Sequence, residues 1–193
     1  MKYRITLVLA ILVGPAIADN SSYSCSPALR CVEEQGPTYD IGRGARIALP
    51  SGWRYFSYAT APDPAMAGLR EIRAFKDGVI IAISPFPNVE RWAFSEEWLR
   101  FQSPLRSRHI RQSREKAVKY VSMSRDDIVG CYASLTAVHE SEKPFDILPN
   151  RRHSSVTSFL ISHKFIIFSI IVVSERLPDE GYLAAADAIR NIQ

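Results

Sequence analysis

The feature that most constrains the fold is the apolar stretch KFIIFSIIVVS, residues 164–174. Only Ser169 interrupts its apolar residues 165–173, so an extended chain here has no polar face. Five isoleucines and two valines lie between Ile161 and Val173, and β-branched side chains favour strands over helices. Because a strand without a polar face must be covered on both sides, we predict a central strand inside a sheet.

Further strands are predicted from alternating patterns and turn signals. These patterns cover residues 46–49, 53–60, 69–75, 79–84, 116–123, 128–139 and 155–162. A Pro-Ser-Gly bend at residues 50–52 precedes the aromatic segment WRYFSY, and the chain then continues as a strand. Its side chains alternate, with Trp53, Tyr55 and Ser57 on one face and Arg54, Phe56 and Tyr58 on the other.

Two helices are expected, one in mid-chain and one at the C-terminus. Residues 94–108 place Trp98, Phe101 and Leu105 on one stripe, although Pro104 interrupts the pattern. Residues 177–193 begin with Pro and two acidic residues, which suit the first turn of a helix. Sequential strands with segregated helices indicate an α+β fold, in which the two helices flank an antiparallel β-sheet.

The N-terminus predicts an export signal in residues 1–18. Lys2 and Arg4 precede an apolar run, and Ala16-Ile17-Ala18 is a typical cleavage site, so we expect cleavage after Ala18. The apolar run is too short to span a bilayer, and we expect a periplasmic protein without a stable membrane anchor. Residues 19–44, rich in Ser, Gly and Pro, predict an N-terminal arm, and residues 45–193 a single α+β domain.

Three cysteines follow the predicted cleavage site, in a compartment that permits disulfide bonds. We expect Cys25 and Cys31 to form the bridge, since they are close in sequence, although the connectivity stays open. Cys131 belongs to an apolar face at period two, with Val129, Ala133, Leu135 and Ala137. A buried free thiol is therefore predicted at Cys131.

Short matches at the start of the first long strand and in the last helix resemble one known family. The matching residues are Leu49, Pro50, Gly52, Trp53, Ile189 and Ile192. With the order of strands and helices over residues 41–192, they resemble the PsbP-like family, which includes the photosystem II extrinsic protein PsbP, the Ran-binding Mog protein and many exported bacterial proteins. The resemblance implies protein binding or scaffolding, without a shared set of catalytic residues.

No strong catalytic signature is found in the sequence. It lacks the Gly-x-Ser-x-Gly, His-Glu-x-x-His, phosphate-loop and Cys-x-x-Cys patterns, and we predict no catalytic residue, no metal site and no cofactor. In VHESE, His139 and Glu140 would point to opposite faces of a strand, so a solvated strand end is favoured over a metal site. Surface positions are predicted for the remaining histidines, His109, His153 and His163.

The most informative charge feature is the basic run LRSRHIRQSREK, residues 105–116. It is either a solvated helix end and loop or an electropositive patch that attracts an acidic protein or anionic headgroups. The candidate binding residues are Arg100, Arg106, Arg108, Arg111, Arg114 and Lys116, with Arg151 and Arg152 as an extension. Without the signal, 22 basic residues face 20 acidic ones, a formal charge of +2, which does not indicate nucleic-acid binding.

These patterns favour a non-enzymatic, exported protein-interaction module. One specific version is an immunity protein that neutralises a secreted antibacterial toxin, with an acidic toxin or effector surface as its partner. Two alternatives remain at this stage: a lipid or small-ligand carrier, and a hydrolase whose triad is assembled from distant residues.

Overall fold

The computed structural model describes residues 38–42, 44–49, 51–59, 69–87, 103–125, 128–139, 141–148, 151–163 and 166–192. Its strands and helices, in chain order, are β1 (Thr38–Gly42), β2 (Ala45–Ala48), β3 (Arg54–Ala59), β4 (Arg70–Lys76), β5 (Val79–Pro87), α2 (Ser107–Arg111), β6 (Val121–Arg125), β7 (Ile128–Thr136), β8 (Ser155–His163), β9 (Ile166–Ser174) and α3 (Glu180–Arg190). The described chain is mostly antiparallel β-sheet with two helices, as expected for an α+β protein.

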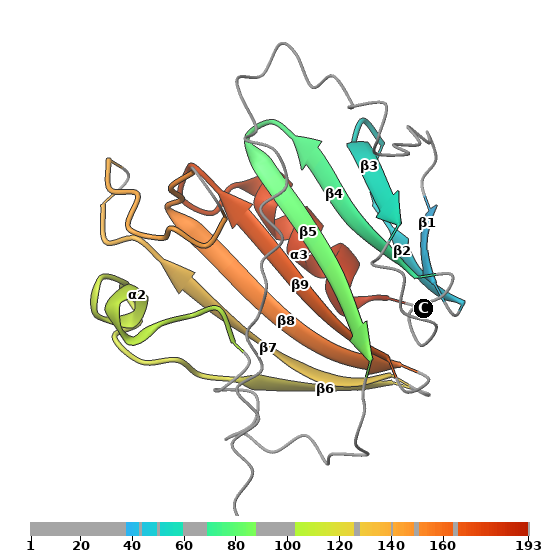
Figure 1. Cartoon of the computed structure of the whole chain (residues 1–193). Helices are drawn as coiled ribbons and strands as arrows, with labels where there is room; N and C mark the ends of the chain where they lie inside the picture. Colours follow the sequence, from blue (N-terminus) through green and yellow to red (C-terminus); the bar gives the residue numbers. More distant parts are fainter. Residues whose placement is uncertain are drawn as a thin grey trace, which may run out of the picture.

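A seven-stranded sheet in the order β3-β4-β5-β9-β8-β7-β6 forms the body of the protein (Figure 1). Every neighbouring pair is antiparallel. The apolar strand β9 lies in the middle, between β5 and β8, and most of its side chains are buried. The prediction of a central strand is confirmed.

Helix α3 covers one face of this sheet (Figure 1). Asp179 caps the helix, since its Oδ1 accepts a hydrogen bond from the Tyr182 N–H at 2.8 Å. Tyr182, Ala185 and Ile189 share a buried core with inward-facing residues of β5, β8 and β9. Residues 180–190 are helical, so the predicted C-terminal helix is confirmed.

The opposite face of the sheet has a second core, made with segments that are neither helix nor strand. Leu105, Phe145 and Leu148 pack there with side chains of β5, β7, β8 and β9. The β9 residue Val173 belongs to this core, whereas Val172 belongs to the first. Both faces of the central strand are therefore covered, as its sequence requires.

The aromatic segment at residues 53–58 is the entry to strand β3. Gly52 has φ +88°, a conformation that side chains rarely adopt, and it makes the bend. Trp53 and Tyr55 are buried in the first core, while Phe56 on the other face packs edge-on against Phe75 at 6.1 Å between ring centroids. The predicted bend and strand are confirmed, and both faces of this strand are packed.

Three boundaries differ from the predictions. Residues 38–42 of the predicted arm form β1, because pairing with β2 places Ile41 in the core at 0% exposure. Residues 103–106 of the predicted mid-chain helix are not helical, and the described helix there is only α2. The strand predicted from residue 116 begins at Val121, since Lys116 has φ +54°. The predicted signal, Arg100 and the Cys25–Cys31 bridge lie outside the described residues.

Candidate interaction surface

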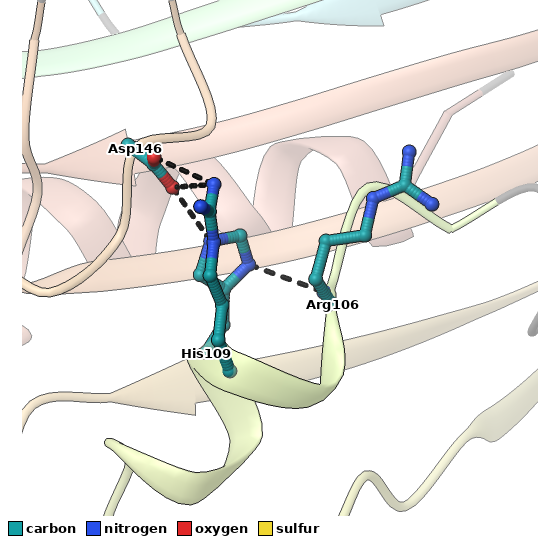
Figure 2. Close-up of polar contacts among 4 residues, drawn as sticks. Arg106, His109 and Asp146 are labelled. Atoms are coloured by element: carbon teal, nitrogen blue, oxygen red, sulfur yellow. Dashed lines mark hydrogen bonds and ion pairs between the residues drawn. The ribbon is translucent and has the colours of Figure 1, made fainter.

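The short helix α2 is held on the protein by one buried side chain, His109, which is 2% exposed. Its Nδ1 accepts a hydrogen bond from the backbone N–H of Arg106 at 3.1 Å (Figure 2). Its Nε2 lies 2.7 Å from Asp146 Oδ1. Arg108 Nε also lies 3.2 Å from Nε2. Because Nδ1 is an acceptor and the carboxylate is closer, Nε2 carries the proton and donates a hydrogen bond to Asp146. The ring also packs edge-on against Phe145 at 6.0 Å, so His109 joins α2 to residues 145–148.

Asp146 also binds the neighbouring arginine. The Arg108 Nη2 lies 2.7 and 2.6 Å from the two oxygens of the Asp146 carboxylate. The hydrogen bond from His109, and then the positive charge of Arg108, lower the pKa of Asp146. The carboxylate is thus charged at neutral pH and neutralises Arg108, which cannot add its full charge to the predicted patch.

The paired nitrogens of His109 leave it no role as a general base. A catalytic histidine must direct a free ring nitrogen at the proton that it removes. In this protein one nitrogen is bound to backbone and the other to a carboxylate. His109 is therefore a structural tether, and the arrangement resembles a catalytic dyad only in its residue types.

The segment after α2 runs along the outer side of β7. Ser113 bridges to Ala137, and the Arg114 N–H donates to the Thr136 carbonyl at 2.8 Å. The side chain of Glu115 accepts a hydrogen bond from the Thr136 N–H at 2.9 Å. Further on, β6 pairs with residues 128–132 of the same strand. One continuous segment thus borders β7 along most of its length.

We call residues 106–120 the basic edge. They contain six basic residues and one acidic residue, a formal charge of +5. The whole chain has a formal charge of +4, so the other 178 residues together carry −1. The excess of positive charge is thus concentrated in this segment beside β7, where it can raise the local concentration of an acidic partner.

The predicted binding residues divide into three groups in the structure. Arg108 and Arg151 form ion pairs with carboxylates, Asp146 and Glu175 respectively. Arg114 and Lys116 are exposed and donate to backbone carbonyl oxygens, those of Val138 and Arg111. Arg106, Arg111 and Arg152 are exposed, and no described acidic residue pairs with them.

Arg151 belongs to a separate cluster around Glu175. The Glu175 carboxylate lies 3.0 Å from Lys143 Nζ and 3.5 Å from Arg151 Nη1. The hydrogen bond from Lys143 is the main cause that lowers the pKa of Glu175, and the charges of Lys143 and Arg151 add to it. Because Glu175 is shared by two cations, this cluster keeps a formal charge of +1, and the predicted extension of the patch by Arg151 is only partly neutralised.

The surface positions predicted for three histidines are wrong. His109, His153 and His163 are 2%, 0% and 3% exposed. The pattern around them is polar, but tertiary contacts bury the rings. His153 is the extreme case: neither of its ring nitrogens has a hydrogen-bond partner among the described residues, and burial lowers its pKa from 6.5 to about 4. His139, in contrast, is exposed just after β7, as predicted.

Cys131 is a buried free thiol, as predicted. It is 4% exposed, and burial raises its pKa to about 11, so it is protonated and a poor nucleophile at neutral pH. The predicted apolar face around it is confirmed at positions 133, 135 and 137, whereas Val129 is 45% exposed. Cys131 is therefore a packing residue.

Two other kinds of site are absent from the ranges that the structure describes. No group of three or more His, Cys, Asp or Glu residues there could hold a metal ion. No described helix is both long and apolar enough to cross a membrane.

Sequence reasoning missed the contact between His109 and Asp146. The two residues are 37 positions apart, and the loop that contains Asp146 has no pattern of its own. A signal that could have been used is the isoleucine next to His109, which marks one side of the segment as apolar.

Comparisons with known proteins returned no match to the chain. No family model matches it, and neither curated proteins nor solved structures gave a significant similarity.

Proposed function

We propose that this chain is an exported, non-enzymatic protein-interaction module that binds an acidic protein surface through the basic edge. The segregation of charge supports this most directly, with +5 on residues 106–120 and −1 on the rest of the chain. The side chains of Arg106 and Arg111 are exposed and lack a described acidic partner, so a partner's carboxylates can pair with them.

The rigid attachment of α2 supports the same proposal. Binding costs less when the contacting residues are already ordered. His109 fixes α2 through Arg106 and Asp146, and Phe145 packs beside it. The exposed arginines therefore project from an anchored helix instead of a free loop.

In its most specific form, the proposal is a periplasmic immunity protein on a PsbP-like scaffold, which neutralises a secreted antibacterial toxin by covering an acidic surface. A hydrolase has less support, because both nitrogens of His109 are occupied and neither nitrogen of His153 contacts a hydroxyl or thiol. No contact among the described residues favours a lipid or small-ligand carrier.

The test is quantitative capture of partners from native periplasmic extract by purified wild-type protein and by Arg111→Glu. We expect Arg111→Glu to lose at least half of the specifically captured partner, and Arg106→Glu/Arg111→Glu to lose more. The matched control is Arg46→Glu, which makes the same charge change at an exposed position of β2, in the small sheet.

Two outcomes would overturn the proposal. The same partners captured by wild type, Arg111→Glu and the double variant would remove the basic edge from function. Binding to phosphatidylglycerol vesicles with no protein partner would replace the protein surface by a lipid one. The immunity version is tested in cells whose growth is stopped by a periplasmic toxin encoded beside this protein. Co-expression of the wild-type protein should restore growth of these cells, and co-expression of Arg106→Glu/Arg111→Glu should not.

A further inference from the structure

Strand β6 is the outermost strand of the sheet, on the side of the basic edge. Among the described strands it pairs only with β7, in an unbroken register from Val121↔Tyr132 to Arg125↔Ile128. Along a strand, successive residues direct their N–H and C=O groups to alternate sides. At least two of the five residues of β6 therefore direct these groups away from β7.

The side chains of β6 leave this strand accessible. Four of its five residues are exposed, and Val121 is 40% exposed. The other edge strand of the same sheet, β3, differs, because Tyr55, Phe56 and Ser57 are all buried. Among the described side chains, the two ends of the sheet are therefore not equivalent, and β6 is the more exposed edge strand.

Usual protection against strand pairing is weak at β6. Edge strands are commonly blocked by proline, by a bulge or by charges within the strand. The sequence Val-Ser-Met-Ser-Arg has no proline, its register with β7 has no bulge, and its one charge is at the end. The irregularity lies upstream: Ser113 faces Ala137, whereas Val121 faces Tyr132, so seven residues, 114–120, lie opposite four of β7, 133–136.

The surrounding charge selects the occupant. Lys119 lies two residues before β6, Arg125 ends it, and the basic edge continues upstream. A second copy of this chain would bring its own excess of positive charge to the same place, which disfavours self-pairing. An extended segment with acidic side chains would meet opposite charges along its length.

We propose that β6 binds an extended acidic segment of the partner as an additional strand of the sheet. This inference rests on the proposed function and adds the mode of binding. Backbone hydrogen bonds to β6 hold the segment, as in other cases of strand addition, while the basic edge selects acidic sequences and accelerates association.

The probe is a short synthetic peptide of alternating glutamate and valine, titrated into the full protein at low salt. A second peptide has the same sequence with N-methyl groups on two adjacent central residues. Because successive N–H groups point to opposite edges of a strand, one of the two methylated nitrogens faces β6 whichever edge of the peptide binds. N-methylation removes a backbone donor and keeps the charge. Each lost hydrogen bond should weaken binding about fivefold, so we expect the methylated peptide to bind at least about fivefold more weakly.

Hydrogen exchange on the wild-type protein gives an independent readout. At a peptide concentration ten times Kd, the outward N–H groups among Val121, Ser122, Met123 and Ser124 should exchange about tenfold more slowly. A peptide with lysine in place of glutamate is the control and should not bind. Lys119→Glu should weaken the acidic peptide without changing which amides are protected.

Equal affinity of both peptides, or unchanged exchange in β6, would overturn strand addition. The proposed function would survive that result, since it is judged by the dependence of partner capture on Arg111. Failure of the acidic peptide to bind at all would also overturn the inference. If Arg111→Glu captures the partner as well as wild type does, while the methylated peptide still binds more weakly than the unmodified one, the proposed function alone is overturned.

Discussion

The unpartnered imidazole of His153 makes a quantitative prediction about acid stability. The ring is 0% exposed, and neither of its nitrogens has a hydrogen-bond partner in the described part of the chain. Desolvation lowers its pKa from 6.5 to about 4; the charge of Glu175 opposes this, and those of Arg151 and Lys143 add to it. We predict that His153→Met removes a pH-dependent loss of stability between pH 6.5 and 4.

The sign and the size of the change in the free energy of unfolding with pH follow from proton linkage. Below pH 6.5 the unfolded chain takes up the proton, while the folded protein keeps His153 neutral until about pH 4. The free energy of unfolding is therefore unaffected above pH 6.5 and falls as the pH falls. The difference between 6.5 and about 4, at about 1.4 kcal/mol per pH unit, gives a loss of up to about 3 kcal/mol.

The assay is urea unfolding followed by tryptophan fluorescence, at a series of pH values from 7.5 to about 4.5. We expect the wild-type free energy of unfolding to fall with pH and that of His153→Met to stay nearly level. At pH 7 the variant should be as stable or more stable by about 1–3 kcal/mol, because no buried polar nitrogen is left unpaired. His139→Met, at an exposed histidine, is the matched control. Equal slopes for wild type and His153→Met would refute the reasoning, as would a variant that is clearly less stable at pH 7.

Three further predictions use the same unfolding assay. Tyr182→Phe removes the hydroxyl 2.6 Å from Thr157 Oγ1 and should cost about 1 kcal/mol; no change would mean that this buried contact is not formed. Gly130→Ala should cost about 1–3 kcal/mol or more, because the new Cβ would lie 2.2 Å from a backbone carbonyl oxygen of β8, and a stable variant would contradict that packing. Asp146→Ala should cost about 1–3 kcal/mol, since it leaves the buried His109 N–H without its acceptor, and a loss below about 0.5 kcal/mol would argue against the tether.

The sequence predicts those parts of the fold whose causes are local. The β-branched, apolar run of β9 predicts a strand that is covered on both faces. Pro178 and Asp179 mark the start of α3. The boundaries of β1 and β6 were missed because they depend on pairing. Ile41 is in a strand only because β2 lies beside it, and Lys116 leaves the β7 edge at a positive φ that its side chain does not predict.

The candidate site was predicted in composition but not in its effective charge. The arginines of residues 106–114 could be selected from the sequence. Which of them keep their charge unpaired depends on loops far along the chain, because Asp146 pairs with Arg108, and Arg151 shares Glu175 with Lys143. Burial of His153 could not be predicted either, since a polar local sequence places no limit on what packs over a side chain.

The pairing of β5 with β9 has a consequence for the order of folding. It joins Val79 to Ser174, a separation of 174 − 79 = 95 residues, in the middle of the sheet. The chain is synthesised from its N-terminus, so the β3–β4–β5 hairpins exist for some time without the strand that completes them. Loop closure over such a distance is slow compared with hairpin formation. We therefore expect the sheet to be completed only after the C-terminal residues have been made, with β5 exposed until then as a site where misfolding can begin.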